Sequence, residues 1–370
     1  MRKNIQYKKL GDICDFISGG TPSKSKMEYW KDGKIPWIKI SDFKKKYIKI
    51  SDEKITKSGL ENSSAKILKK GTILYTIFAS VGKVAILDIE AATNQAIVGI
   101  DLKGNNLLDK DFLYYFLCSI ENNIKKQARG VAQNNINISI LKNISIPILS
   151  MSLQKSIVKT LNKLEDILEN FKQKKLLINF LNKSLFIKFN KNGVEKQLDE
   201  VADIIMGQSP LSQSYNIDKK GLPFYQGKTE FGDMYIKESN IYCNLPIKIA
   251  EKNDILMSVR APVGDVNIAI HKSCIGRGLA SIRAKKIDYL YLFYLLKEQK
   301  TRIEKMGVGS TFKAINKNNI SSLKMSIVEM NKQNKIKKYL ILTEKLSFEI
   351  EKSIKEAENL YNSLMNKYFD

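Results

Sequence analysis

The sequence has 370 residues, a hydrophobic share of 43% and a formal net charge of +24. Its length allows two or more domains, and its composition is that of a folded globular protein rather than a disordered one. It contains no apolar run near the ~20 residues that span a bilayer, and its N-terminus lacks the apolar core of a signal peptide. We therefore expect a cytoplasmic protein with no membrane partner. The four cysteines are far apart and form no C-x-x-C pair, as expected of free thiols in a reducing compartment.

The excess of positive charge makes a nucleic-acid backbone the first candidate partner. Only six of the 62 basic residues are arginine, and the rest are lysine. Abundant Lys, Ile and Asn also fit an AT-rich genome, so a solvated lysine coat is the alternative to polyanion binding. Arginine is the more informative residue, because its planar guanidinium can contact a phosphate or a guanine edge through two hydrogen bonds at once.

Short motifs of the first half recur in the same order in the second half. The first three pairs are SGGTPSKS (18–25) with MGQSPLSQ (206–213), IPWIKISDF (35–43) with LPFYQGKTEF (222–231), and KKGTILYTIFASVGKVAI (69–86) with EKNDILMSVRAPVGDVNI (251–268). The next three are TNQAIVGI (93–100) with IGRGLASI (275–282), DFLYYFL (111–117) with DYLYLFYLL (288–296), and RGVAQNNINISILKNISIPI (129–148) with VGSTFKAINKNNISSLKMSI (308–327). A repeat of about 180 residues is too long for a solenoid unit, so the pattern predicts a tandem domain duplication.

Each copy contains short β-rich runs separated by Gly-containing loops. The runs lie at 71–78, 83–89 and 96–102 in the first copy, and at 253–260 and 265–271 in the second. They predict an α+β module with a mostly antiparallel, irregular sheet and one short aromatic helix.

A long stretch without Gly or Pro closes each copy, from Ser152 to about Phe189 and from Asn331 to the C-terminus. Apolar residues recur there in steps of three and four, which is typical of a coiled coil. The stripe residues are Ile157, Leu161, Leu164, Leu168 and Phe171 in the first stretch and Ile336, Leu340, Ile350, Ile354 and Leu364 in the second. We expect two helices of roughly 55 Å. An antiparallel pair is the favoured arrangement, and separate packing of each helix on its own domain is the alternative.

The chain then divides into a first domain (1–150), a first spacer helix (151–190), a second domain (191–330) and a second spacer helix (331–370). Reaction chemistry is not visible in any of these segments. The single histidine, His271, lies on an alternating strand and is expected to be structural, and SVGKV (80–84) lacks the residues of a phosphate-binding loop. No methyltransferase string, two-metal carboxylate set or glycosidase pair is present. We expect no catalytic residue, metal or cofactor in this chain.

The ordered motifs, each set followed by a long helix, resemble the specificity subunit of type I restriction-modification systems. The resemblance spans essentially the whole chain. It implies two target-recognition domains, each reading one half of a split double-stranded DNA sequence. It also implies spacer helices that set the gap between the half-sites and dock methyltransferase and restriction (translocase) subunits. The same resemblance implies that the partners carry S-adenosylmethionine, ATP and Mg²⁺, and that the methyltransferase modifies adenine.

Polar and basic loop residues are the candidate DNA contacts. They are Thr21, Lys39, Ser41, Lys83, Asn94, Gln95, Arg129, Gln133 and Asn134 in the first module, and Ser209, Gln226, Lys228, Arg260, Arg277, Ser310, Thr311 and Lys313 in the second. Arg260 and Arg277 stand where the first copy has Phe78 and Gln95, which predicts an asymmetric target.

Simpler roles compete with some of these assignments. Arg260 and Arg277 could form ion pairs within their module, and Thr21 and Ser209 could merely close turns. Trp37 and Phe224 are expected in the core rather than as base-stacking platforms. At the level of the whole chain, the alternatives are a standalone DNA-binding protein of the same fold and a basic coiled-coil scaffold. A nuclease or methyltransferase is disfavoured by the missing motifs.

Overall fold

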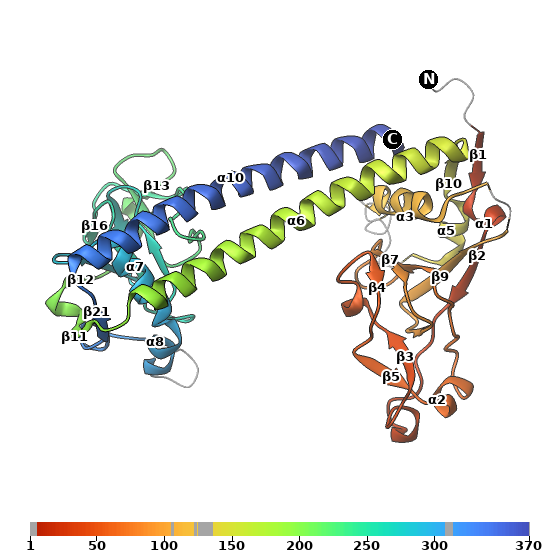
Figure 1. The fold of residues 1–370 in the computed structure, drawn as a ribbon, viewed down its shortest axis with the longest axis horizontal. Coiled ribbons are helices and arrows are strands. Elements are labelled where there is room, and N and C mark those ends of the chain that lie inside the picture. The colour runs from red at the N-terminus through yellow and green to blue at the C-terminus, as the bar shows by residue number, and fades with distance from the viewer. Residues whose placement is uncertain (1–5, 105–106, 122–123, 125–135, 308–313, 370) are drawn as a thin grey trace. The chain divides into compact units, whose positions relative to one another are not determined.

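The computed structural model describes residues 6–104, 107–121, 124, 136–307 and 314–369 (Figure 1). The chain forms two compact units, one of Met1–Asn170 with Ser353–Asp370 and the other of Phe171–Lys352. We call them unit 1 and unit 2 and describe each by itself. Two long helices, α6 (Met151–Phe189) and α10 (Met330–Phe369), each contribute residues to both units.

Unit 1 is built on a five-stranded sheet in the order β2-β9-β6-β7-β4. Its strands are β2 (Cys14–Ser18), β9 (Ile97–Leu102), β6 (Ile73–Thr76), β7 (Val84–Leu87) and β4 (Tyr47–Ile48). A three-stranded sheet joins β5 (Glu53–Ile55), β3 (Ile35–Ile38) and β8 (Ala92–Thr93), and β1 (Gln6–Lys9) pairs with β10 (Ser145–Ile148). The pairings are antiparallel except for β3 with β8 and β4 with β7.

The main helix of unit 1 is α3 (Lys110–Ser119), and Asp109 caps it by accepting a hydrogen bond from Phe112 N. Its residues from Phe112 to Leu117 are all buried, because the helix packs between the central sheet and α6. The shorter helical elements are α1 (Leu10–Ile13), η1 (Met27–Tyr29), η2 (Ile40–Asp42), α2 (Lys57–Glu61) and α5 (Ile138–Asn143).

Unit 2 repeats this plan. Its four-stranded sheet has the order β12-β20-β17-β18, formed by β12 (Ala202–Met206), β20 (Leu279–Ala284), β17 (Ile255–Ser258) and β18 (Val266–Ile268). A five-stranded sheet contains β13 (Tyr215–Asn216), β15 (Tyr242–Cys243), β14 (Leu222–Tyr225), β19 (Ser273–Ile275) and β16 (Ile249–Ala250). The remaining elements are β11 (Val194–Gln197) paired with β21 (Lys324–Ile327), η3 (Leu198–Glu200), η4 (Ser212–Ser214), α7 (Tyr289–Glu298), α8 (Lys300–Met306) and α9 (Lys317–Ser321).

The predicted duplication is visible in the strand register. In unit 1, Ile73 of β6 lies between Ile86 and Ile100 of the neighbouring strands. In unit 2, Ile255 of β17 lies in the same way between Ile268 and Ile282. Aligned motifs therefore occupy equivalent places in two similar modules, and the predicted mostly antiparallel α+β architecture is confirmed.

A buried glutamine in the first turn of each long helix makes equivalent hydrogen bonds in the two units. Gln154 accepts a hydrogen bond from Asp109 N at 2.8 Å, and its amide donates to Leu107 O and Leu149 O. Gln333 accepts from Asp288 N at 3.1 Å and donates to Val328 O. Each glutamine thus ties the start of the long helix to the N-cap of the short aromatic helix, a link that no local sequence pattern indicates.

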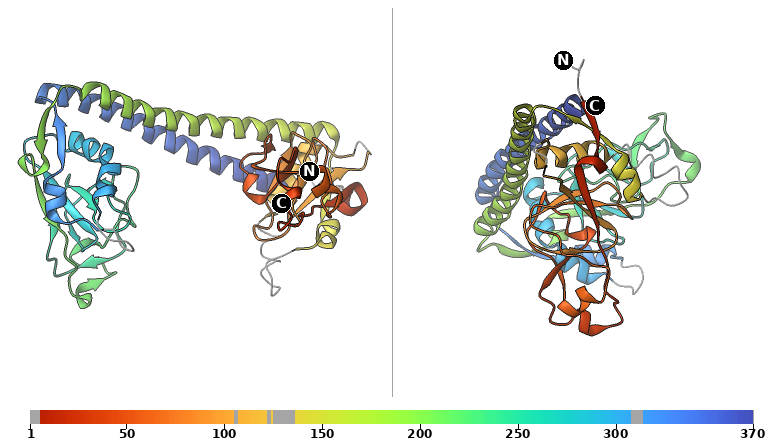
Figure 2. Two further views of the ribbon diagram at one scale, coloured as in Figure 1. Left: turned by 90° about the horizontal axis from the view of Figure 1, so that it is seen from below. Right: turned by 90° about the vertical axis from the view of Figure 1, so that its right-hand side faces the viewer.

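The two long helices run antiparallel and side by side within each unit (Figures 1 and 2). In unit 1 the side chains of Glu165 and Tyr361 are hydrogen-bonded at 3.3 Å. In unit 2 the rings of Phe189 and Tyr339 stack with centroids 5.5 Å apart. The helix bounds lie within one residue of those expected.

All ten predicted stripe residues are buried or half-buried. The helices also complete the module cores: Ile157, Leu161 and Met365 belong to the core of unit 1, and Ile336 and Leu340 to that of unit 2. Pairing and packing on the domains therefore occur together.

Candidate nucleic-acid interface

Loops at the ends of neighbouring strands come together in unit 1. They comprise residues 19–22, 39–41, 77–83 and 94–96, which we call loop cluster 1. Backbone hydrogen bonds link them in series, from Gly20 N to Thr93 O (2.8 Å), from Asn94 N to Ile38 O (3.1 Å) and from Ile77 N to Ala96 O (2.8 Å). The predicted contacts Thr21, Lys39, Ser41, Lys83, Asn94 and Gln95 all belong to this cluster.

The equivalent loops of unit 2 are residues 207–210, 226–228, 259–265 and 276–278, which we call loop cluster 2. Its backbone links are Gln208 N to Ile275 O (3.0 Å), Gly276 N to Tyr225 O (2.8 Å) and Val259 N to Gly278 O (2.9 Å). These bonds repeat the pattern of loop cluster 1. Ser209, Gln226, Lys228, Arg260 and Arg277 belong to it.

The first residue of each turn must be glycine, because the backbone of an adjoining loop lies too close for a Cβ atom. A Cβ atom on Gly19 would lie 2.1 Å from Asn94 O, and one on Gly207 would lie 2.2 Å from Gly276 O. Any side chain at either position would push the turn away from the adjoining loop. The Gly of SGGTPSKS and of MGQSPLSQ is therefore what brings the turn into its cluster.

The turn hydroxyls hold neighbouring side chains of the cluster. Thr21 Oγ1 donates to Gln95 Oε1 in unit 1. In unit 2, Ser209 Oγ donates to Gln226 Oε1 at 2.9 Å and accepts a hydrogen bond from Arg277 N at 3.3 Å. These residues do more than close a turn, because they orient the glutamines beside them; their own contact with DNA stays a prediction.

Arg260 and Arg277 are exposed, and within the described part of the chain no carboxylate oxygen lies within 4.0 Å of either guanidinium. Arg283, in contrast, donates two hydrogen bonds to the Asp254 carboxylate at 2.9 and 2.8 Å. Arg302 donates to the carbonyl of Lys324 at 3.1 Å. The ion-pair alternative thus describes Arg283 and not the two candidate arginines.

Two of the candidate lysines already have carboxylate partners. Lys39 is paired with Glu53 at 2.5 Å, and Lys228 with Asp265 at 2.5 Å. Asp265 also binds Lys300 at 2.6 Å. Partial burial alone would raise the pKa of Asp265, but its hydrogen bonds to Lys228 and Lys300 hold that pKa below its usual range. Lys39 and Lys228 are therefore positioned by partners, which sequence spacing did not reveal.

Asp265 occupies the place that Lys83 holds in the first copy, at the end of the loop between the two equivalent strands. Thr76 Oγ1 accepts a hydrogen bond from Lys83 N at 2.9 Å, and Ser258 Oγ accepts one from Asp265 N at 3.0 Å. The hydrogen bond from the backbone N–H to a strand hydroxyl is the same in both units, while the charge of the side chain is reversed. The two clusters share a frame and differ in chemistry.

Six predicted contacts lie outside the described residues. They are Arg129, Gln133, Asn134, Ser310, Thr311 and Lys313. Trp37 and Phe224 are buried, with 2% and 5% of their surface exposed, and they belong to the core as expected. His271 faces Tyr225, with 3.1 Å between Nε2 and the phenol oxygen, and this hydrogen bond agrees with the expected structural role.

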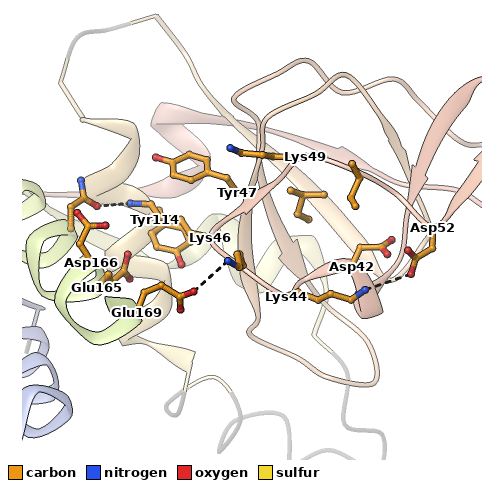
Figure 3. Close-up of a pocket in the computed structure, with 14 residues that line it drawn as sticks. Asp42, Lys44, Lys46, Tyr47, Lys49, Asp52, Tyr114, Glu165, Asp166 and Glu169 are labelled. Carbon is orange, nitrogen blue, oxygen red and sulfur yellow. Dashed lines mark hydrogen bonds and ion pairs between the residues drawn. The ribbon is translucent and has the colours of Figure 1, made fainter. Parts of the chain in front are cut away.

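A cavity of about 880 Å³ lies in unit 1 between the Lys44–Asp52 segment and α6. Figure 3 shows Glu165, Asp166 and Glu169 of α6 across the cavity from that segment. Lys46 contacts Asn162 at 2.8 Å, and burial raises the pKa of Glu165, which accepts hydrogen bonds from Tyr115 and Tyr361. Several polar groups that line this cavity bind one another across it, and they join the Lys44–Asp52 segment to α6.

Among the described residues, no three or more His, Cys, Asp or Glu side chains are grouped as a metal would require. Across those same residues no helix is both long and apolar enough to cross a membrane.

The structure contains two similar modules, and each presents a cluster of polar loops on a rigid sheet. This arrangement is that of a binding protein with two separate binding modules.

Comparison with known proteins agrees with this class. The model of the type I restriction modification DNA specificity domain matches residues 2–179 and again 190–358. The putative type I restriction enzyme MjaX specificity subunit of Methanocaldococcus jannaschii is 34% identical, over 98% of this chain and 92% of the relative. The EcoR124I/EcoR124II specificity subunit of Escherichia coli is 30% identical over 44% of this chain and 41% of its own length. The chain belongs to the type I restriction-modification DNA specificity family, which confirms the resemblance drawn from its motifs.

Solved structures show the same fold. A chain from a study of complex assembly and conformational transition of the type I R-M system has a TM-score of 0.62 and 24% identity, covering 100% of this chain and 98% of that one. The type I restriction-modification S subunit from M. genitalium also has a TM-score of 0.62, at 19% identity, covering 99% of this chain and 96% of its own. The repeated architecture therefore occurs in type I specificity subunits.

Proposed function

We propose that this chain is the DNA-reading subunit of a type I restriction-modification complex and that it recognises a bipartite, asymmetric double-stranded target. Each unit reads one half-site through its loop cluster. The observation that carries the proposal is the pair of arginines in loop cluster 2, Arg260 and Arg277, exposed on a frame whose first copy has Phe78 and Gln95 at those places. Different side chains on equal frames read different sequences.

Phosphate contacts supply the sequence-independent part of the affinity. The net charge of +24 and the exposed Lys83 support this part of the proposal. Lysine–phosphate contacts release condensed counterions, so the affinity for duplex DNA falls steeply as salt rises.

Methyltransferase subunits dock on the long helices, and restriction subunits join that complex. Apolar side chains exposed on α6 and α10 in unit 2 support this docking: Leu176 is 61% exposed, Leu177 65%, Phe180 70%, Leu342 65% and Leu346 51%. Exposed apolar patches of this kind mark protein interfaces. They favour a partner-bound subunit over a standalone DNA-binding protein. S-adenosylmethionine, ATP and Mg²⁺ are then carried by the partners, and the complex works in the cytoplasm.

Methylome sequencing of a host expressing this chain together with methyltransferase subunits of its own operon tests the proposal. The expected result is adenine methylation in a split, non-palindromic motif that disappears when this chain is omitted. A palindromic motif would contradict the proposed asymmetry, because it would mean that both units read the same half-site. Duplex binding by the assembled complex that does not depend on salt would favour the scaffold alternative.

A further inference from the structure

We propose that segment 23–31 of unit 1 is a second DNA-contact surface, outside loop cluster 1. In this inference Lys24, Lys26 and Lys31 bind backbone phosphates of the duplex, and Met27 and Trp30 pack on the adjoining sugars or bases. The inference rests on the proposed function, and it adds to unit 1 a contact surface that loop cluster 1 does not include.

The three lysines are exposed and form no ion pair with any described residue, and Glu28 is the one carboxylate within the segment, so its charge is net positive. Within the described chain, no carboxylate oxygen lies within 4.0 Å of their amino groups. Lys24 Nζ lies 5.7 Å from the centroid of the Trp30 ring, and Lys26 Nζ donates to the Tyr29 hydroxyl at 2.9 Å. Several other exposed lysines of unit 1, such as Lys69, are paired with carboxylates. The segment therefore presents a local positive charge that a phosphate would neutralise.

An exposed apolar surface lies among these charges. Met27 is 75% exposed, and it borders a shallow cavity of about 400 Å³ that Lys24, Trp30, Lys31 and Glu53 also line. A large apolar side chain that is exposed to water between lysines does not contribute to the stability of the free protein. Against a nucleic acid, the same arrangement lets the lysines bind phosphates while the thioether and the indole cover sugar and base surface.

The segment is held on a rigid frame. Trp30 Nε1 donates to Ser23 O at 3.1 Å, and the Trp30 ring meets Trp37 edge-on with centroids 4.9 Å apart. Thr56 Oγ1 donates to Glu28 O at 2.9 Å. The contact side chains are thus positioned before any ligand binds, which lowers the ordering cost of binding.

The segment continues directly from loop cluster 1. It follows the Thr21-Pro22 turn, and Trp37 Nε1 donates to Gly20 O at 2.9 Å. The buried Trp37 therefore supports the turn of loop cluster 1 on one side and Trp30 on the other. In Figure 1 this part of unit 1, near β3, β5 and α2, lies at the end away from α6 and α10. A duplex seated on loop cluster 1 would have segment 23–31 beside it.

Tryptophan fluorescence of the full chain, alone and with its methyltransferase partners, tests the contact directly. The chain has two tryptophans, Trp30 and Trp37, and Trp37 is only 2% exposed. We expect titration with duplex DNA to quench selectively excited tryptophan emission in parallel with binding. Trp30→Phe should still bind duplex but lose most of the quenching. Full binding by the wild-type chain without any change in emission would overturn the inference.

A charge-matched comparison separates the contact from general basicity. The triple variant Lys24→Ala, Lys26→Ala and Lys31→Ala is compared with a control triple in which Lys57, Lys69 and Lys70, each of them ion-paired, are replaced by Ala. Because the first triple removes three lysine–phosphate interactions, it should reduce the slope of log affinity against log salt by about 2 to 3. The control triple should reduce that slope by less than about 1. Equal slopes for the two triples would overturn the inference.

Failure of the proposed function looks different. If the wild-type complex does not bind duplex DNA at any salt concentration, the DNA-reading function itself is wrong. If it binds normally and only the comparison of the two triples fails, the loop clusters remain the interface and segment 23–31 has no part in it.

Discussion

Tyr361 donates a hydrogen bond to Glu165 at 3.3 Å, and these two residues are 196 positions apart in the chain. The bond joins the last turns of α10 to the first half of α6 within unit 1. Met365 is buried in the same core, and the Phe369 ring lies 5.2 Å from that of Phe112. The first module is therefore complete only when the end of α10 has packed against it.

Met365→Ala should destabilise unit 1 by about 2–4 kcal/mol, because it removes a buried side chain and leaves a cavity. Leu360→Ala is the control, since Leu360 lies on the same helix but is 50% exposed. Urea unfolding of the full chain, followed by circular dichroism, measures both. A loss no larger than that of the control would mean that the end of α10 contributes little to the core.

Gln154→Leu should cost about 2–4 kcal/mol, because it leaves the Asp109 amide and two carbonyls without their buried partners. Gln333→Leu should have a comparable effect in unit 2. Replacing the exposed Ser156, on the same helix as Gln154, by Leu should change stability by less than about 0.5 kcal/mol. Thermal unfolding of each variant measures the difference, and equal melting temperatures for Gln154→Leu and Ser156→Leu would contradict the assigned role.

Asp265→Asn should lower stability by about 1–2 kcal/mol at neutral pH, since it removes a carboxylate held by Lys228 and Lys300. The folded-state pKa of this carboxyl is depressed, so its contribution is present above its unfolded pKa of about 4 and is lost as pH falls through the folded value. The stability difference between wild type and variant should therefore shrink under acid conditions.

Denaturation at a series of pH values measures this dependence. Asp203→Asn is the matched control, because Asp203 forms a more exposed pair with Lys285. Its effect at neutral pH should stay below that of Asp265→Asn. A constant difference between wild type and Asp265→Asn across the acid range would rule out the carboxylate as its cause.

Arg277→Ala and Arg260→Ala should each relax base discrimination at the half-site of unit 2 by about 1–3 kcal/mol and leave the other half-site unchanged. Selection from a randomised duplex pool by the assembled complex measures both half-sites at once. Lys286→Ala, which removes one exposed charge before α7, is the control. It should slightly lower the affinity for every DNA sequence and leave the base preference unchanged. Uniform loss of affinity with either arginine variant would show that the residue binds phosphate.

Much of the architecture was predictable because it depends on local patterns. Helix bounds followed from three-to-four apolar spacing without Gly or Pro, and the equivalence of Ile73 with Ile255 followed from aligned motifs. For the candidate DNA contacts, the sequence predicts which loops carry them but not which side chains are already paired. Residue type alone predicts Lys39 and Lys228 as DNA contacts, yet they are paired with carboxylates that lie 14 and 37 positions away in the chain.

The duplication, the element types and the family can be inferred from the sequence, because turns, periodicity and ordered motifs depend on neighbouring residues. Which charges are neutralised, and which core each helix end completes, becomes clear only from the folded chain. Those outcomes depend on contacts between distant residues, such as Asp265 with Lys300 and Glu165 with Tyr361. Such contacts form when strands and helices pack, and no local pattern encodes them.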